Sequence, residues 1–295
     1  MKRYIMGPIS FGSTSSTTLW QTQNIRVNPG IERLVQAANT TDVVFAGLVK
    51  QVPALTFDTP AIARMLGVIG FGGANIDQVD IYFRQMDHGG TIVAGANHVK
   101  VSLLDTLGLL RRITASQWQE ASASFEIQAA YDGTNIPIAV TTGQSLPAYD
   151  NSVIEKFTVG PAELNSTDLD NIQSFDLDTG ITVETDGQDG GPYARLAAIK
   201  ERQPVITLTT FDAEALSTVG VNGASKDNAI AWLRALTNKG APAADTASSH
   251  IKFTAADSHV IISDMGDTTT INIQPVWDGS NDMLAIATGQ AIEAL

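Results

Sequence analysis

Cysteine is absent from the 295 residues, which excludes disulfides, thiolate metal ligands and cysteine nucleophiles. Basic residues are scarce, since 18 Lys and Arg stand against 31 Asp and Glu and give a formal net charge of -13. Tight binding to free nucleic acid or to an anionic membrane needs a basic surface, so this balance argues against both. Charged residues make up only 17% of the chain. The surface must therefore be rich in uncharged polar groups or be hidden in contacts with other subunits.

Long apolar runs are also missing. No segment approaches the ~18 apolar residues of a membrane-spanning helix, and Met1-Lys2-Arg3 is not followed by a sustained hydrophobic region. We therefore expect a soluble protein with no membrane partner and no signal peptide. Hydrophobic residues still make up 43% of the chain, which is enough for a packed core.

Short motifs recur in the same order in two halves of the chain. Tyr-Asp-Gly-Thr-Asn at 131–135 returns as Trp-Asp-Gly-Ser-Asn at 277–281. Six such pairs keep offsets between 146 and 153 residues: Gly7 with Gly160, Arg26 with Asp176, Gly73 with Gly223, His98 with His250, Asp132 with Asp278, and Gly143 with Gly289. We interpret this as an internal duplication into two domains, residues 1–149 and 150–295, separated by turn-forming residues near Pro147.

Alternating apolar residues predict strands in both halves. Phe125–Tyr131 and Ile271–Trp277 place apolar residues at every second position, which is typical of a strand with one buried face. The Asp-Gly motif after each predicts a hairpin turn that returns the chain through 136–140 and 283–286. Further strands are expected around 25–27, 54–57, 99–103, 175–177, 205–208 and 251–253.

One helix is expected in each half. Asn75 can cap a helix whose apolar stripe runs from Ile76 to Met86, and Ser225 can cap its equivalent from Ala229 to Leu236. A shorter helical turn is expected over 60–66. The predicted fold class is therefore mainly β with one helix per domain, as two tandem antiparallel β-sandwich or curved-sheet domains.

The plan of each half resembles the tail tube proteins of long-tailed bacteriophages and their relatives in contractile injection machines. Each half starts a strand with Gly-Pro, at Gly7-Pro8 and Gly160-Pro161, and then has a long polar hairpin region. A capped helix follows a glycine-rich turn, and a closing hairpin ends in Thr-Gly-Gln. The resemblance covers the chain twice and rests on this pattern, because the family has no catalytic signature.

The resemblance implies a structural virion protein without enzymatic activity or cofactors. Family members build stacked rings in which the sheets of successive domains close around a DNA channel, usually with six domains per ring. A chain with two such domains would form a homotrimeric, pseudo-hexameric ring. The implied partners are further copies of the chain, other tail proteins, and phage DNA that passes without specific binding. The implied location is the virion tail, after assembly in the host cytoplasm.

Acidic residues of the second half are the candidates for the channel wall. Asp176, Asp178 and Glu184 would repel phosphates and let DNA slide past. Arg26 stands in the first half where Asp176 stands in the second, so we expect the charge of the wall to alternate around the ring.

Other motifs favour structural roles. His98 and His250 each open a strand without a recognisable triad partner, so we expect no catalytic residue. The acidic loop 186–191 lacks the EF-hand spacing and favours a hairpin tip over a metal site. The glycines of 67–73 lack the residues that complete a phosphate-binding or dinucleotide loop and indicate a turn.

Two other functions stay open at this stage. A tail-tip or baseplate hub protein would share the fold but would close the tube instead of extending it. A tandem carbohydrate-binding β-sandwich is less favoured, because aromatic residues are only 6% of the chain and fall mostly on expected core faces.

Overall fold

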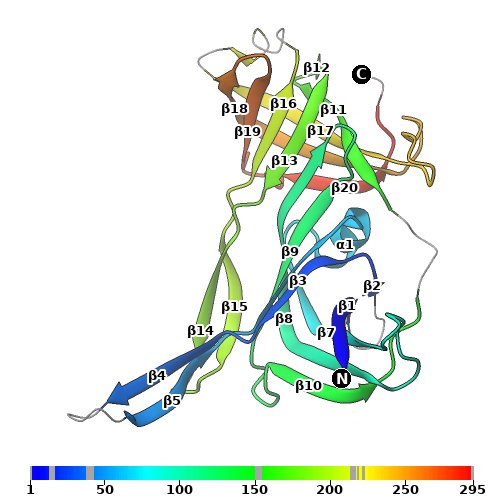
Figure 1. The fold of residues 1–295 in the computed structure, drawn as a ribbon. Coiled ribbons are helices and arrows are strands. Elements are labelled where there is room, and N and C mark those ends of the chain that lie inside the picture. The colour runs from blue at the N-terminus through cyan, green and yellow to red at the C-terminus, as the bar shows by residue number, and fades with distance from the viewer. Residues whose placement is uncertain are drawn as a thin grey trace.

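The computed structural model describes residues 2–12, 17–37, 43–149, 155–212, 217, 219–220 and 223–293. Figure 1 shows an elongated molecule, with the N-terminal half in the lower part and the C-terminal half in the upper part of the view. Hairpin β4–β5 projects to the lower left, and hairpin β14–β15 runs down the left side of the view toward the base of β4–β5. The expected mainly β fold is confirmed, since strands and large antiparallel sheets dominate the described chain.

The described residues of the first half form ten strands and one helix. Their bounds are β1 Arg3–Phe11, β2 Thr17–Leu19, β3 Gln23–Asn28, β4 Ile31–Ala37, β5 Val43–Gln51, β6 Ala54–Thr59, α1 Ile62–Ile69, β7 Ala74–Met86, β8 His98–Ser116, β9 Ser122–Ala129 and β10 Ile138–Gln144. The second half adds β11 Phe157–Leu164, β12 Thr167–Leu169, β13 Ile172–Asp178, β14 Thr182–Gly187, β15 Ala194–Glu201, β16 Val205–Thr210, β17 Ala224–Ala235, β18 His250–Met265, β19 Thr269–Val276 and β20 Ala285–Gln290.

The strand pairings of the first half recur in the second half, with every strand number raised by ten. In the first half β1 pairs with β2 and β7, β8 with β7, β9 and β10, β6 with β3 and β9, and β4 with β5. The same pairs occur among β11 to β20. We call two residues counterparts when they hold the same register position in the two halves. The domain boundary at 149/150 stays a prediction, because residues 150–154 lie outside the described part of the chain.

The long strand β8 joins the two sheets of the first half. Its first part pairs with β7 and β10, and its later part pairs with β9. Aromatic rings pack between the sheets, since Phe11 of β1 lies 5.9 Å from Phe57 of β6, measured between ring centroids. In the second half Phe175 and Phe253 pack with centroids 4.8 Å apart. The buried face of α1 belongs to the same core, which runs through both halves.

The helices predicted at 75–86 and 225–236 are wrong, because both segments are strands, β7 and β17. Ile76 and Val79 are both buried although they lie three residues apart, which imitates helical spacing. The ladder is irregular at this point, since Asp105 in the paired strand β8 has φ 47° and Asn228 within β17 has φ 50°. Beyond the irregularity β-branched and aromatic residues alternate, as strands favour.

The shorter helical turn predicted at 60–66 corresponds to α1, which buries Ile62, Met65, Leu66 and Ile69. The counterpart of α1 falls largely on residues outside the described part of the chain. The expectation of one helix per domain is therefore met by α1 in the first half and stays a prediction in the second half.

The predicted hairpins after β9 and β19 are wrong in their pairing. β10 does not return along β9, because it pairs with the first part of β8, beside the stretch that β9 occupies. β20 pairs with β18 in the same way. The turn chemistry itself is present, since the carboxylates of Asp132 and Asp278 each accept backbone N–H bonds from residues two and three positions later.

The turn at Asp278 generates a prediction for pH dependence. The N–H and side chain of Asn281, with the N–H of Ser280, lower the pKa of Asp278 from 3.8 to about 2. A depressed carboxyl pKa stabilises the fold above the unfolded value, and this contribution disappears as the pH falls from about 3.8 through about 2. NMR titration of the Asp278 carboxyl carbon is expected to give a midpoint near 2, and Asp278→Asn should remove this part of the acid sensitivity. A midpoint at the ordinary aspartate value would contradict the hydrogen bonding of the turn.

Candidate functional site

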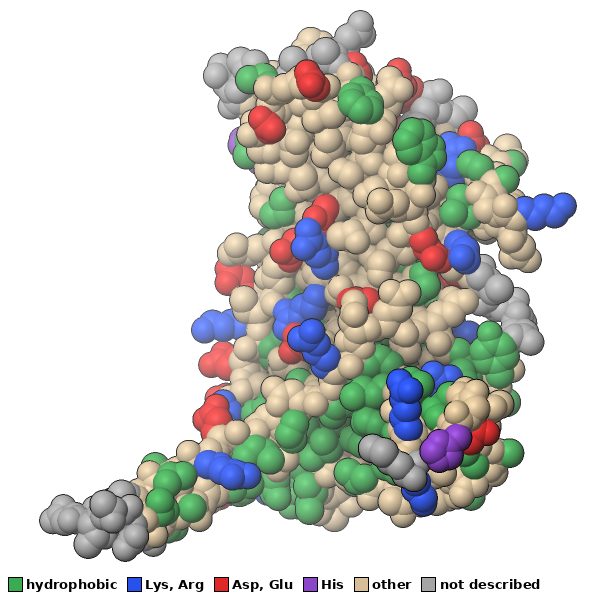
Figure 2. Space-filling view, in the orientation of Figure 1, with side chains coloured by type: hydrophobic (Ala, Val, Ile, Leu, Met, Phe, Trp, Pro, Cys, Tyr) green, Lys and Arg blue, Asp and Glu red, His purple; other side chains and the backbone are tan. Residues whose placement is uncertain are grey.

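A polar face runs along the sheet formed by β3, β6, β9, β8, β13, β16, β19 and the end of β18. In β9 the core residues Phe125 and Ile127 alternate with Glu126 and Gln128, and the neighbouring strands follow the same alternation in register. Most groups on this face are uncharged, as in the hydrogen-bonded pair Thr207 and Asn272. Figure 2 shows few charged side chains over the upper part of the molecule, among a broad area of backbone and of side chains that are neither charged nor hydrophobic. The face is therefore polar and carries few charged side chains.

Charged groups on this face are mostly paired or hydrogen-bonded. Asp58 accepts from Asn24 and Ser124, and Glu126 pairs with Arg111 at 2.9 Å. By register the acids of the face are Asp58, Glu126, Asp176, Asp178 and Asp264, and the bases are Arg26, Arg111 and Arg112.

The two halves meet at a continuous strand pairing between β8 and β13, which we call the internal seam. Ser174–Asp178 of β13 pair with Arg112–Ser116 of β8. On the core side Leu177 lies opposite Ile113, and both are fully buried. On the polar face Arg112 donates from Nε to Oδ1 of Asp176 at 2.8 Å and makes a second bond from Nη2 to Oδ2. This carboxylate raises the pKa of Arg112 above its ordinary value.

A hairpin reinforces the internal seam. Just after β13, the N–H and hydroxyl of Thr179 donate to carbonyls of β8. The chain then turns at Gly180, whose φ of +55° and contact with the carbonyl of Gln203 leave no room for a Cβ. The base of hairpin β14–β15 next covers Leu107 and Leu109 of β8 with an apolar cluster that includes Ile181, Val183 and Ile199.

The strands equivalent to β8 and β13 are β18 and β3, and these two do not pair with each other among the described strands. β13 pairs with β16 on one edge and β8 on the other, but β3 pairs only with β6 among the described strands. On β18, the edge facing β17 is paired from Ile251 to Val260, and residues 261–265 continue beyond it. Residues 261–265 are the counterparts of the stretch of β8 that leads into the internal seam. Within the described residues the chain thus has two unpaired strand edges, one on β3, which is equivalent to β13, and one at the end of β18, which is equivalent to β8.

Apolar side chains are exposed where their counterparts at the internal seam are buried. Ile261 is 40% exposed while its counterpart Leu109 is 0% exposed, and Met265 is 59% exposed while Ile113 is 0% exposed. On hairpin β4–β5, Ile31 is 46% exposed while its counterpart Ile181 is 5% exposed. Figure 2 shows hydrophobic side chains along this projecting hairpin. Its exposed apolar residues are Ile31, Leu34, Val35, Val43, Phe45, Leu48 and Val49.

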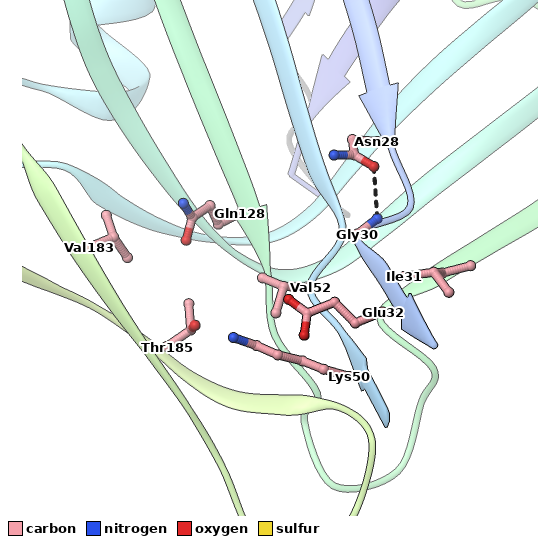
Figure 3. A pocket seen from close by; sticks show the side chains of 9 residues that line it. All are labelled: Asn28, Gly30, Ile31, Glu32, Lys50, Val52, Gln128, Val183 and Thr185. Carbon is pink, nitrogen blue, oxygen red and sulfur yellow. Dashed lines mark hydrogen bonds between the residues drawn. The ribbon is translucent and has the colours of Figure 1, made fainter. Parts of the chain in front are cut away.

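Hairpin β4–β5 carries hollows on its surface and at its base. One, of about 390 Å³, is lined by Ile31, Arg33 and residues 46–48. A second, of about 430 Å³, opens between the two hairpins, where Glu32 and Lys50 point into the space beside Gln128 (Figure 3). The first hollow is apolar apart from Arg33, and the second has one charge of each sign.

The three acids predicted for the channel wall are not all brought together. Asp176 and Asp178 lie two residues apart on β13 and share the polar face. Asp176 is neutralised by Arg112, and Asp178 accepts the N–H of Gly180 at 2.9 Å. Glu184 lies on hairpin β14–β15, which is a separate two-stranded sheet. Arg26 is the counterpart of Asp176, since each lies opposite a threonine, Thr56 or Thr207.

Both predicted structural histidines bind the backbone. His98 is 2% exposed and its Nδ1 accepts the N–H of Gln85 at 3.1 Å, and burial lowers its pKa. His250 is fully buried, with Nδ1 accepting the N–H of Ala235 at 3.0 Å. Each ring therefore ties the start of one long strand to the end of its neighbour.

The other candidate motifs form no metal-binding cluster among the described residues. The acidic loop 186–191 forms the end of hairpin β14–β15, and no group of three or more His, Asp or Glu in the described chain could hold a metal. The glycines 67–73 end α1 and lead into β7. Within the same residues, no helix is long and apolar enough to cross a membrane.

Comparison with protein-family models and with curated proteins gives no match. Sequence reasoning missed the internal seam and its open counterpart. The only signal was the recurring motif at 25–31 and 175–181, which marks the two strands but not their neighbours.

Proposed function

We propose that the chain is a structural subunit of a phage tail tube, in which copies join head-to-tail into a trimeric, pseudo-hexameric ring. Rings would stack, and the polar face of the curved sheet would line a channel through which DNA passes. The observation that carries the proposal is the open counterpart of the internal seam. A free strand edge with a matching free edge at the other end of the same chain favours head-to-tail association.

The backbone supports this association first. If β3 of one chain lies along the end of β18 in the next, Val27 falls opposite Met265, as Leu177 falls opposite Ile113 inside the chain. We call this the outer seam. It would satisfy backbone groups that β3 leaves unpaired in the isolated chain. One difference is that Pro29 replaces Thr179, so the outer seam lacks that N–H donor.

Side chains support the same arrangement. In the outer seam, hairpin β4–β5 would cover Ile261 with Ile31 and Leu48, as hairpin β14–β15 covers Leu109 with Ile181 and Ile199. Burial of apolar surface contributes ~25 cal/mol per Å², so these exposed residues provide a driving force for association.

The polar face supports a channel. Uncharged groups predominate there, and acids outnumber bases, so phosphates would meet water and weak repulsion. The net charge of -13 per chain acts in the same direction. Such a wall lets DNA slide because it provides no row of cations to replace the counterions of the duplex.

Ring formation can be tested with one substitution at the outer seam. Sedimentation of the wild-type chain is expected to give a species of three times 31.2 kDa, and electron microscopy should show rings or tubes. Ile261→Lys would place a charge under hairpin β4–β5 and should return the protein to monomers. Val140→Lys, at a residue of β10 that is 65% exposed, is the matched control and should assemble normally.

A monomeric wild type at all concentrations would contradict the proposal, and so would unchanged rings of Ile261→Lys. Single rings that never stack would favour a tail-tip or baseplate hub over a tube.

The channel can be tested by placing cations on the polar face. Thr207→Lys together with Asn272→Lys would add six lysines per trimeric ring, and the rings should then bind double-stranded DNA with an affinity that falls steeply with salt. Val140→Lys adds a cation away from this face and should not bind in the same way. Equal DNA binding by both variants, measured by fluorescence anisotropy, would contradict the placement of the channel wall.

A further inference from the structure

We infer that Arg26 pairs with Asp264 of a second copy across the outer seam, with the charges in the reverse order to the pair at the internal seam. The inference rests on the proposed head-to-tail assembly and names the contact that determines which strand edges join. The occupant of the open edge is a second copy of this chain, because charge and register match at both ends.

The internal seam provides the template. Asp176 stands on the incoming strand β13, and Arg112 stands on the receiving strand β8. Two hydrogen bonds join the guanidinium to the carboxylate on the polar face. The pair is partly exposed, with side-chain exposures of 57% for Arg112 and 31% for Asp176.

Register identifies the counterparts of both residues. Arg26 lies opposite Thr56 on β6, as Asp176 lies opposite Thr207 on β16. Asp264 lies opposite Thr270 on β19, just after a bulge. Arg112 lies opposite Ser124 on β9, after a bulge at the same place. On the outer seam the incoming strand therefore carries the cation and the receiving strand carries the anion.

Neither residue of the proposed pair has an ionic partner within the described part of the chain, and both are exposed. An arginine and an aspartate at matched positions of two free edges are what a charge-complementary interface requires. The receiving edge also bears Met265, beside the place where Val27 would lie.

The reversal has a consequence for specificity. β3 and β13 share the same alternation, with Ile25 and Val27 at the core positions of Phe175 and Leu177, so the pattern of apolar residues does not distinguish the two seams. Charge separates them. β3 on β8 would bring Arg26 to Arg112, and β13 on β18 would bring Asp176 to Asp264. Like-charge contacts of this kind disfavour wrong pairings.

Charge reversal tests the pair directly in the full-length protein. Arg26→Asp alone and Asp264→Arg alone would each create a like-charge contact, and each is expected to weaken association by about tenfold per seam. The double variant restores an opposite pair and should recover assembly. Lys239→Asp and Asp282→Arg reverse charges in exposed loops and are the controls.

A mixture of the two single variants shows that the contact forms between chains. Arg26→Asp offers Asp on both edges and Asp264→Arg offers Arg on both, so every seam between unlike chains is complementary. Sedimentation should show stronger association in the mixture than in either variant alone at the same total concentration. A ring of three must keep one like-charge seam, so assemblies with an even number of chains are expected.

Reversing all four residues tests the specificity. In the double variant both incoming strands carry Asp and both receiving strands carry Arg, so charge no longer distinguishes the two seams. We expect this variant to give a broad distribution of assembly sizes. Adding Arg112→Asp and Asp176→Arg makes the two seams distinct again and should return a single species.

The outcomes separate this inference from the proposed function. A wild type that forms rings, with single reversals that assemble as well as the controls, would overturn the Arg26–Asp264 pair and leave the ring standing. A single, uniform species for the double variant would overturn the specificity that we assign to the reversal. A wild type that never associates would overturn the ring and, with it, the pair.

Discussion

An unpaired strand edge is the constraint on which the rest of the structure depends. Backbone groups along an edge must find partners, and an exposed edge invites another strand. Inside the chain β13 fills the edge of β8, and this joins two similarly built halves into one sheet with one core. Among the described strands, β3 and the end of β18 lack that partner. In the assembly that we propose, chains would join by repeating a contact that each chain already makes with itself.

The proposed outer seam would also account for the exposed apolar residues of the surface. Ile31, Ile261 and Met265 are exposed although their counterparts are buried, and these exposed positions gather along one hairpin and one strand end. A low content of charged residues would fit a surface that is partly the proposed interface and partly the polar face of the sheet. An internal duplication would allow the two seams to differ, so that the internal seam carries Asp176 with Arg112 and the proposed outer seam would carry Arg26 with Asp264.

Much of the fold could be predicted from local pattern, but the partners of the strands could not. Alternation at 125–131 and 271–277 predicted strands that are present, because one buried face leaves a period of two. At 75–86 the pattern misled, since an irregular ladder puts Ile76 and Val79 three residues apart on buried positions. The turn at Asp132 was predicted from its chemistry, yet the strand after it pairs with β8, which only the tertiary structure reveals. The acids at 176–184 were predicted as one group, but Glu184 belongs to a separate hairpin.

Disulfide trapping tests the outer seam most directly, because the chain has no cysteine of its own. Val27→Cys and Met265→Cys should lie opposite each other between chains, within the ~7 Å between Cα atoms that a disulfide allows. Val27→Cys with Ile261→Cys is the control, since position 261 is four residues, about 13 Å, further along the strand. We expect oxidation of the first pair to give covalent dimers and trimers with no larger species on a non-reducing gel. No cross-linking, or equal cross-linking of the control pair, would contradict assembly through this seam.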